Sequence, residues 1–174
     1  MFHGERVTLR PMLESDLPTY LEYRNDIDLH FLSSDDPPTP ITIENLKAKF
    51  DSHDSTKAPW FAIEFQGRFI GQCIVYDINY FHRNCAIGLT IGDKDCRGIG
   101  LGSEVVNLLC MYAFDLLNME KVWLQTTGNN KAAIQCYKKC GFVVEGVQKN
   151  HVWYAGKYEE LITMGRFKHL FGDN

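Results

Sequence analysis

Apolar and polar residues alternate with a period of two along several stretches of the chain, a pattern typical of strands that bury one face. Two pairs of these stretches are joined by the short turns Gln66-Gly67-Arg68 and Ala155-Gly156, which predict hairpins. We therefore expect a mixed, mostly antiparallel sheet of about seven strands. The predicted strands are residues 6–10, 60–65, 69–78, 85–91, 122–126, 143–154 and 157–167.

Other stretches place apolar residues at a helical spacing, and they predict about four helices flanking the sheet. The clearest apolar stripe follows a glycine-rich turn and continues to residue 118. Thr42 is the expected N-cap of another helix, and Gly141 is the expected C-cap of a third. A strand, a helix and a strand in that order over residues 85–126 predict one parallel crossover. The fold class is therefore α+β. The predicted helices are residues 14–24, 42–50, 103–118 and 130–140.

Length and composition predict a single domain over residues 1–174. A chain of 174 residues with 45% hydrophobic content is long enough for one hydrophobic core and short for two domains. The formal net charge is −4. This balance lacks the basic footprint of a nucleic-acid-binding protein. The sequence also has no apolar run near the roughly 20 residues of a membrane span. We expect neither nucleic acid nor membrane as a partner.

Six cysteines lie within apolar, strand-like or helix-like runs, and we expect no signal peptide. We expect them to be reduced in a cytoplasmic protein. Cys136 and Cys140 are four residues apart on a predicted helix, but no second pair or histidine cluster accompanies them. Packing is therefore their expected role, and no metal site is predicted.

The glycine-spaced turn Arg97-Gly98-Ile99-Gly100-Leu101-Gly102 leads directly into the predicted helix that begins at Ser103. Such a turn leaves the first backbone N–H groups of a helix free to bind a phosphate or pyrophosphate. The dinucleotide fingerprint would require a glycine at position 103, and a Walker A loop would require a following Gly-Lys-Ser/Thr. The turn therefore predicts an anion site of another kind.

The order of elements, the Arg-x-x-Gly-x-Gly turn at 97–102 and the stretch from Asn130 to Phe142 together resemble the GNAT superfamily of acetyl-CoA-dependent N-acyltransferases. Within it, the chain looks most like the branch of RimJ/RimL-type N-terminal acetyltransferases and bacterial spermidine N-acetyltransferases. Residues 7–11, 77–83 and 156–158 carry that likeness. It is weakest over residues 26–58, where such families place acceptor-binding helices.

The resemblance implies acetyl-CoA as the co-substrate, bound where the central sheet splays apart. It implies that Asn130 contacts the phosphopantetheine arm and that Tyr137 is the general acid that protonates the leaving thiolate. A phenol with an ordinary pKa of ~10 is protonated at neutral pH, as an acid must be. The implied cofactor-binding residues are Leu89, Thr90, Ile91, Arg97, Gly98, Ile99, Gly100, Leu101, Gly102, Ser103, Asn130 and Tyr137.

The general base is the point at which the chain departs from this resemblance. Many relatives in the branch carry a glutamate two residues before Gly88, where this chain has Ala86. We expect Asp77 to be the catalytic residue that receives the amine proton through water, with Glu64 and His151 as alternatives. A further alternative is that the amine arrives neutral.

The expected acceptor is a protein N-terminus or a small cationic amine, because the acidic pair Asp35-Asp36 near the weakly matching region and Asp77 together favour a cationic partner. Two alternatives are a polyamine N-acetyltransferase specifically and, given Ala86, a non-catalytic CoA-binding regulatory module. A nucleotide-binding phosphotransferase would rest on the glycine turn alone. The late strands can support a homodimer.

Overall fold

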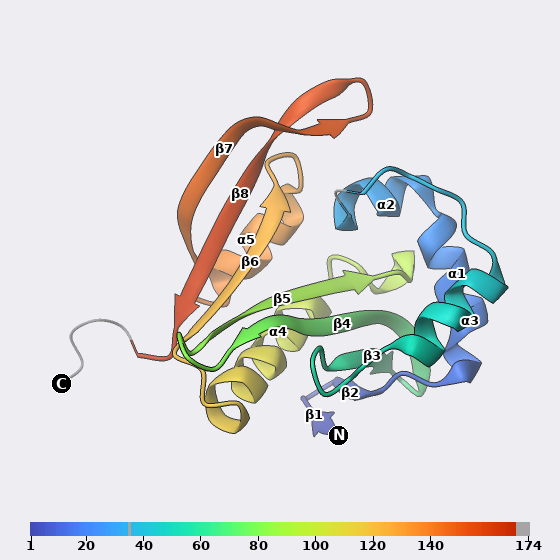
Figure 1. Cartoon of the computed structure of the whole chain (residues 1–174), viewed down its shortest axis with the longest axis horizontal. Helices are drawn as coiled ribbons and strands as arrows, with labels where there is room; N and C mark the ends of the chain where they lie inside the picture. Colours follow the sequence, from blue (N-terminus) through green and yellow to red (C-terminus); the bar gives the residue numbers. More distant parts are fainter. Residues whose placement is uncertain (35, 170–174) are drawn as a thin grey trace.

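The computed structural model describes residues 1–34 and 36–169. In this part of the chain, eight strands form a single mixed sheet in the order β1-β2-β3-β4-β5-β6-β8-β7 (Figure 1). The α+β fold is confirmed, and the strand not predicted is the two-residue β1. The strands are β1 (Phe2–His3), β2 (Val7–Pro11), β3 (Trp60–Phe65), β4 (Arg68–Asn79), β5 (Asn84–Ile91), β6 (Lys121–Thr127), β7 (Val143–Tyr154) and β8 (Lys157–Phe167).

The sheet splays apart between β5 and β6, the one parallel pair of neighbours in this order. These strands pair only at Asn84↔Lys121, Cys85↔Val122 and Ala86↔Trp123. Beyond Ala86 they diverge, and Figure 1 shows β5 and β6 opening as a V. The parallel crossover predicted over residues 85–126 is confirmed.

The described residues form five α-helices, one more than expected. The additional helix is α2, which follows α1 after a break at Asp26, whose side chain accepts hydrogen bonds from the N–H groups of Asp28 and Leu29. The fourth helix begins two residues earlier than predicted and continues as a π-helical turn over Tyr112–Leu116. The helices are α1 (Leu17–Asn25), α2 (Ile27–Ser33), α3 (Ile43–Ser52), α4 (Leu101–Met111) and α5 (Lys131–Lys139).

Two hydrophobic clusters hold these elements together. The larger one packs α4 and α5 against the central strands, with Val105, Leu109 and Leu124 among its fully buried members. The smaller one packs α1 and α3 against β3 and β4 through residues such as Leu46 and Trp60. The larger cluster includes residues of both β5 and β6, and so holds these strands together where they pair.

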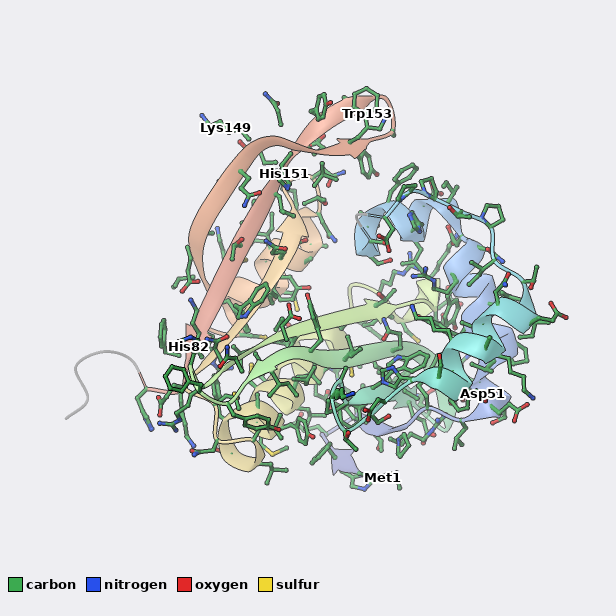
Figure 2. All side chains as sticks on the ribbon, viewed as in Figure 1. Met1, Asp51, His82, Lys149, His151 and Trp153 are labelled. Carbon is green, nitrogen blue, oxygen red and sulfur yellow. The ribbon has the colours of Figure 1, made fainter. Side chains whose placement is uncertain are left out.

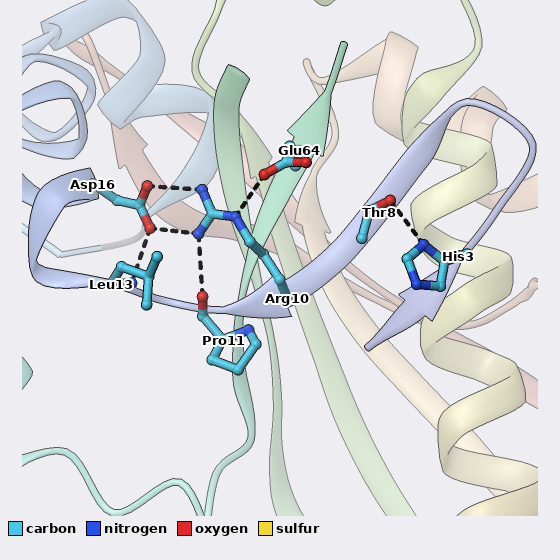
Figure 3. A network of polar contacts seen from close by, with 7 residues as sticks. All are labelled: His3, Thr8, Arg10, Pro11, Leu13, Asp16 and Glu64. Atoms are coloured by element: carbon cyan, nitrogen blue, oxygen red, sulfur yellow. Dashed lines mark hydrogen bonds and ion pairs between the residues drawn. The ribbon is translucent and has the colours of Figure 1, made fainter. Parts of the chain in front are cut away.

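A buried ion pair anchors the start of α1 to the sheet (Figure 3). Arg10 on β2 donates two hydrogen bonds to Asp16, of 2.7 and 2.9 Å, and one of 2.8 Å to Glu64 on β3. Asp16 also accepts the backbone N–H of Leu13 at 2.9 Å. Because Asp16 is only 6% exposed, this network satisfies a carboxylate that has lost nearly all contact with water.

The six cysteines are free, as predicted, and five of them are buried. No helix within residues 1–34 and 36–169 is both long and apolar enough to cross a membrane.

Candidate active site

A cavity of about 590 Å³ opens where β5 and β6 diverge. Its walls come from β5, the glycine turn, α5, α2 and the free end of β6. Ten of the twelve predicted cofactor-binding residues line it. These are Leu89, Thr90, Ile91, Arg97, Gly98, Gly100, Gly102, Ser103, Asn130 and Tyr137.

The side chains of the other two residues, Ile99 and Leu101, are placed elsewhere. The carbonyl of Ile99 accepts a 2.9 Å hydrogen bond from the guanidinium of Arg6, and its side chain is exposed. Leu101 is fully buried in the larger cluster because it occupies the core-facing side of α4. Only the backbone of these two residues is left for a role in phosphate binding, which stays a prediction.

The glycine turn has the geometry expected of an anion site. Gly98 and Gly100 have φ angles of +74° and +90°, which glycine adopts without strain. Gly100 is the N-cap of α4 and provides no side chain to cap the helix, so the N–H groups of the first turn are left for a ligand. The Arg97 guanidinium donates hydrogen bonds to the carbonyls of Ile91 (2.9 Å) and Gly92 (2.6 Å), and so holds the end of β5 against the turn.

Asn130 connects two walls of the cavity. Its Oδ1 accepts the N–H of Ala133 at 3.1 Å and caps α5, and its Nδ2 donates to the carbonyl of Leu32 at the end of α2, also at 3.1 Å. The Asn130 side chain thus fixes the start of α5 relative to α2, the helix that the sequence did not predict.

Tyr137 lies two turns along α5, lines the cavity and is 8% exposed. Burial raises the pKa of its phenol above the ordinary value, and the nearby Cys136 and Tyr76 act in the same direction. The phenol therefore keeps its proton through the neutral range, which suits a general acid.

Cys136 is a residue of the cavity lining that the sequence did not predict. Its Sγ lies 3.3 Å from the hydroxyl of Ser103, and the Cys140 thiol donates to the Ser103 carbonyl at 3.5 Å. Hydrogen bonds from Cys140 and Ser103 lower the pKa of Cys136, against the effect of burial. Because Ser103 and Cys136 are 33 residues apart and meet only through packing of α4 on α5, no sequence signal could have shown this contact.

The predicted bases are not brought into this cavity. Asp77 is exposed in an irregular stretch of β4, where its φ is +49°, and it is outside the cavity lining. Glu64 is paired with Arg10. Ala86, at the position where the resemblance led us to expect glutamate, is fully buried. The assignment of Asp77 as base stays a prediction, and a proton from the cavity would have to reach its carboxylate from outside the lining.

His151 lines a second cavity, of about 440 Å³, together with Asp36 and Trp153. Figure 2 shows His151 and Trp153 on the projecting β7–β8 hairpin. This cavity shares Phe31 and Ser34 with the first, so the two adjoin at the end of α2. Asp35, the other half of the predicted acidic pair, lies outside the described residues.

The family model described as acetyltransferase (GNAT) domain matches residues 6–143, most of the chain. The chain belongs to the GNAT acetyltransferase family. Spermidine N(1)-acetyltransferase of Escherichia coli K12 is 28% identical over 166 residues, covering 95% of this chain and 88% of that protein. The enzyme of the same name from Vibrio cholerae is 26% identical over 162 residues, covering 92% of each chain.

A solved structure of spermidine N-acetyltransferase from Vibrio cholerae in complex with CoA and spermine has the same fold. Its TM-score is 0.87 at 24% identity, and the match covers 95% of this chain and 97% of that one. This GNAT protein is therefore an N-acetyltransferase that takes its acetyl group from acetyl-CoA and transfers it to an amine. The resemblance to spermidine N-acetyltransferases is confirmed, and that to the RimJ/RimL type stays a prediction.

Proposed function

We propose that the protein catalyses direct attack of a primary amine on acetyl-CoA in a ternary complex, with Tyr137 as general acid. The observation that carries this proposal is the cavity at the β5–β6 splay, where the glycine turn and Tyr137 face one continuous space. The free N–H groups at the start of α4 suit the pyrophosphate. Residues Leu89–Ile91, which have no β6 partner, suit the amides of the pantetheine arm.

In the reaction, the lone pair of the neutral amine forms a bond to the thioester carbon, and the carbonyl oxygen becomes an oxyanion. A backbone N–H near Leu89 stabilises that oxyanion. The C–S bond then breaks, and the thiolate of CoA takes the Tyr137 proton. The amine nitrogen loses its extra proton to water, and the phenol is reprotonated from solvent.

The proposed acceptor is a protein N-terminus or a small cationic amine. A polyamine is the second candidate, supported by relatives that are named spermidine N-acetyltransferases. The Vibrio cholerae structure with CoA and spermine supports the same candidate.

The test is to follow free thiol release from acetyl-CoA over a panel of peptides, amino acids and polyamines. We expect amine-dependent thiol release and an acetylated product whose mass is raised by one acetyl group. Acetyl-CoA binding without turnover on any acceptor would instead favour the non-catalytic CoA-binding module.

We also propose a homodimer through the late strands. β7 is an edge strand, and Val143, Val144 and Val147 are exposed along it. Apolar side chains on an open edge favour pairing with a second copy. Val147→Lys is expected to convert a dimer to a monomer in sedimentation velocity, and a sedimentation coefficient equal to that of the unaltered protein would count against this surface.

A further inference from the structure

One face of the central strands forms the floor of the cavity beside the reacting centre. In the β4–β5 register Gln72 lies opposite Thr90, Ile74 opposite Gly88 and Tyr76 opposite Ala86. Because side chains alternate along a strand, these six positions share one face of the sheet. All of them except Ala86 line the cavity.

The position of Ala86 is covered by aromatic rings. Its cross-strand neighbours are Tyr76 on β4 and Trp123 on β6, and the centroids of these two rings are 6.3 Å apart. Ala86 beneath them is fully buried. A carboxylate at this position would enter a dry aromatic environment and would cost free energy there unless a cation paired with it.

The titratable side chains that line the cavity come from three parts of the fold. β4 contributes the phenol of Tyr76, and α5 contributes Cys136, Tyr137 and the cation Lys139. The glycine turn contributes the cation Arg97. Within residues 1–34 and 36–169, the cavity lining includes no carboxylate and no histidine.

The remaining polar groups on the floor and on β6 are neutral, and two of them have defined partners. The Gln72 side-chain oxygen accepts the indole N–H of Trp60 at 2.8 Å. The amide of Gln125 donates to the Thr163 hydroxyl at 3.2 Å. The fixed charge of the protein lining is thus positive, with Arg97 beside the turn proposed for the CoA pyrophosphate. An ammonium ion at the floor of the cavity loses water without gaining a carboxylate partner from the lining.

We infer, resting on the proposed function, that the acceptor amine binds this cavity in its neutral form, so that the weakly basic α-amino group of a peptide is acetylated in preference to a strongly basic polyamine. The adjoining second cavity provides space for the residues that follow the N-terminus. Its walls include Phe31, Pro38 and Tyr154, and the rings of Phe31 and Tyr154 lie 5.0 Å apart. They also include the titratable side chains of Asp36 and His151, which face the chain beyond the reacting amine and not the floor of the first cavity.

The expected preference follows from the fraction of each amine that is neutral. With ordinary pKa values of about 8 for an α-amine and about 10.4 for an alkylamine, roughly 10% of the first and 0.04% of the second are neutral at pH 7. If only the neutral form reacts, kcat/KM at pH 7 favours the peptide by about 200-fold.

The experiment measures kcat/KM from pH 6.5 to 9.5 for a lysine-free tetrapeptide with a free N-terminus, for n-butylamine and for spermidine. We expect the peptide profile to rise and level off near the pKa of its own amine, and the other two to rise throughout. Spermidine turnover at pH 7 equal to or above that of the peptide would overturn the inference, and so would one inflection common to all three acceptors.

Ala86→Glu tests the same inference from the side of the protein, with Ala86→Gln as the neutral control of nearly equal size. The glutamate variant is expected to raise spermidine kcat/KM at pH 7 at least tenfold relative to the glutamine variant. Calorimetry with acetyl-CoA tests whether the two variants remain folded. If either variant fails to fold, the pH profiles of the unaltered protein test the inference alone. No turnover with any amine would contradict the proposed function itself, and this inference with it.

Discussion

The two walls of the cavity are built differently. The donor wall, formed by β5, the glycine turn and α5, is the surface of the main core, and the residues directly beneath it, such as Leu101 and Val105, are fully buried. The acceptor wall, formed by α2 and, in the adjoining second cavity, by the tip of the β7–β8 hairpin, carries partly or largely exposed side chains such as Trp153, at 62%. Figure 1 shows α2 and the hairpin on opposite sides of the opening.

This difference indicates which part of the site can change without loss of the fold. A substitution in the donor wall disturbs the buried residues beneath it. Because protein cores are densely packed, such a change lowers the free energy of unfolding. The acceptor wall is held by a few polar anchors and leaves most of its side chains exposed to solvent. We therefore expect stability and acetyl-CoA affinity to depend on the donor wall, and acceptor choice on the other.

The largest expected effect concerns the anchor of α1, which precedes the acceptor wall. Arg10→Met leaves the Asp16 carboxylate buried without its cation, so the free energy of unfolding should fall by about 3 kcal/mol. Urea denaturation measures it. The control is Arg68→Met, whose side chain is 62% exposed and 3.5 Å from Asp93. The control should lose about 0–1 kcal/mol, and equal losses in the two variants would show that the wall needs no buried anchor.

The next effect is on chemistry at the donor wall. Tyr137→Phe is expected to lower kcat about 100-fold, because it removes the proton donor for the thiolate, with little change in acetyl-CoA affinity. Steady-state kinetics and calorimetry measure the two quantities. Tyr112→Phe is the matched control, since Tyr112 packs on Phe2 and Phe61 away from the cavity lining. An unchanged kcat would remove Tyr137 from the mechanism.

A third prediction concerns the reactivity of the donor wall. Because the pKa of Cys136 is lowered, its thiolate predominates at a lower pH than that of an ordinary thiol. Iodoacetamide should therefore modify Cys136 about ten times faster at pH 7 than expected for an unperturbed exposed cysteine, whose pKa is about 8.5.

Peptide mapping by mass spectrometry identifies the modified cysteine. Acetyl-CoA should slow its labelling, and Ser103→Ala should move the pH midpoint upwards. Cys73, whose pKa burial raises, should remain unlabelled in the folded protein. Labelling of Cys136 that rises only above pH 8 would contradict the lowered pKa.

The smallest expected effect is on acetyl-CoA affinity, and two glycine variants distinguish backbone strain from loss of ligand binding. Gly98→Ala places a side chain at a φ of +74°, which costs about 1 kcal/mol, and should weaken acetyl-CoA binding about fivefold by displacing the turn. Gly67→Ala is matched to it, with a φ of +72° in the β3–β4 hairpin and equally open space around its Cβ. Calorimetry should show that only the first variant loses affinity.

The sequence predicted the donor wall well because local signals specify it. Three glycines marked the turn, and Asn130 and Gly141 marked the limits of α5. In the structure Asn130 is indeed the N-cap, and Gly141 has a φ of +83° just after the helix. Thr42 likewise caps α3 as expected.

The acceptor wall could not be predicted in the same way. α2 has only seven residues, too few for a clear helical period, and it is separated from α1 by a single capping residue, Asp26. The irregular stretch at Asp77 places a non-glycine residue at positive φ, for which the sequence has no signal. Contacts such as Phe31 with Tyr154 join residues far apart in the chain and follow from tertiary packing alone.

The three-residue pairing of β5 with β6 has a consequence for the backbone beyond Ala86. From that point each strand is an edge strand in the middle of a sheet, with a row of N–H and C=O groups that no neighbouring strand satisfies. Exposed edges of this kind normally attract other polypeptides and lead to aggregation. Here they lie in the interior of the sheet, where they face the cavity of about 590 Å³ and not the outer rim.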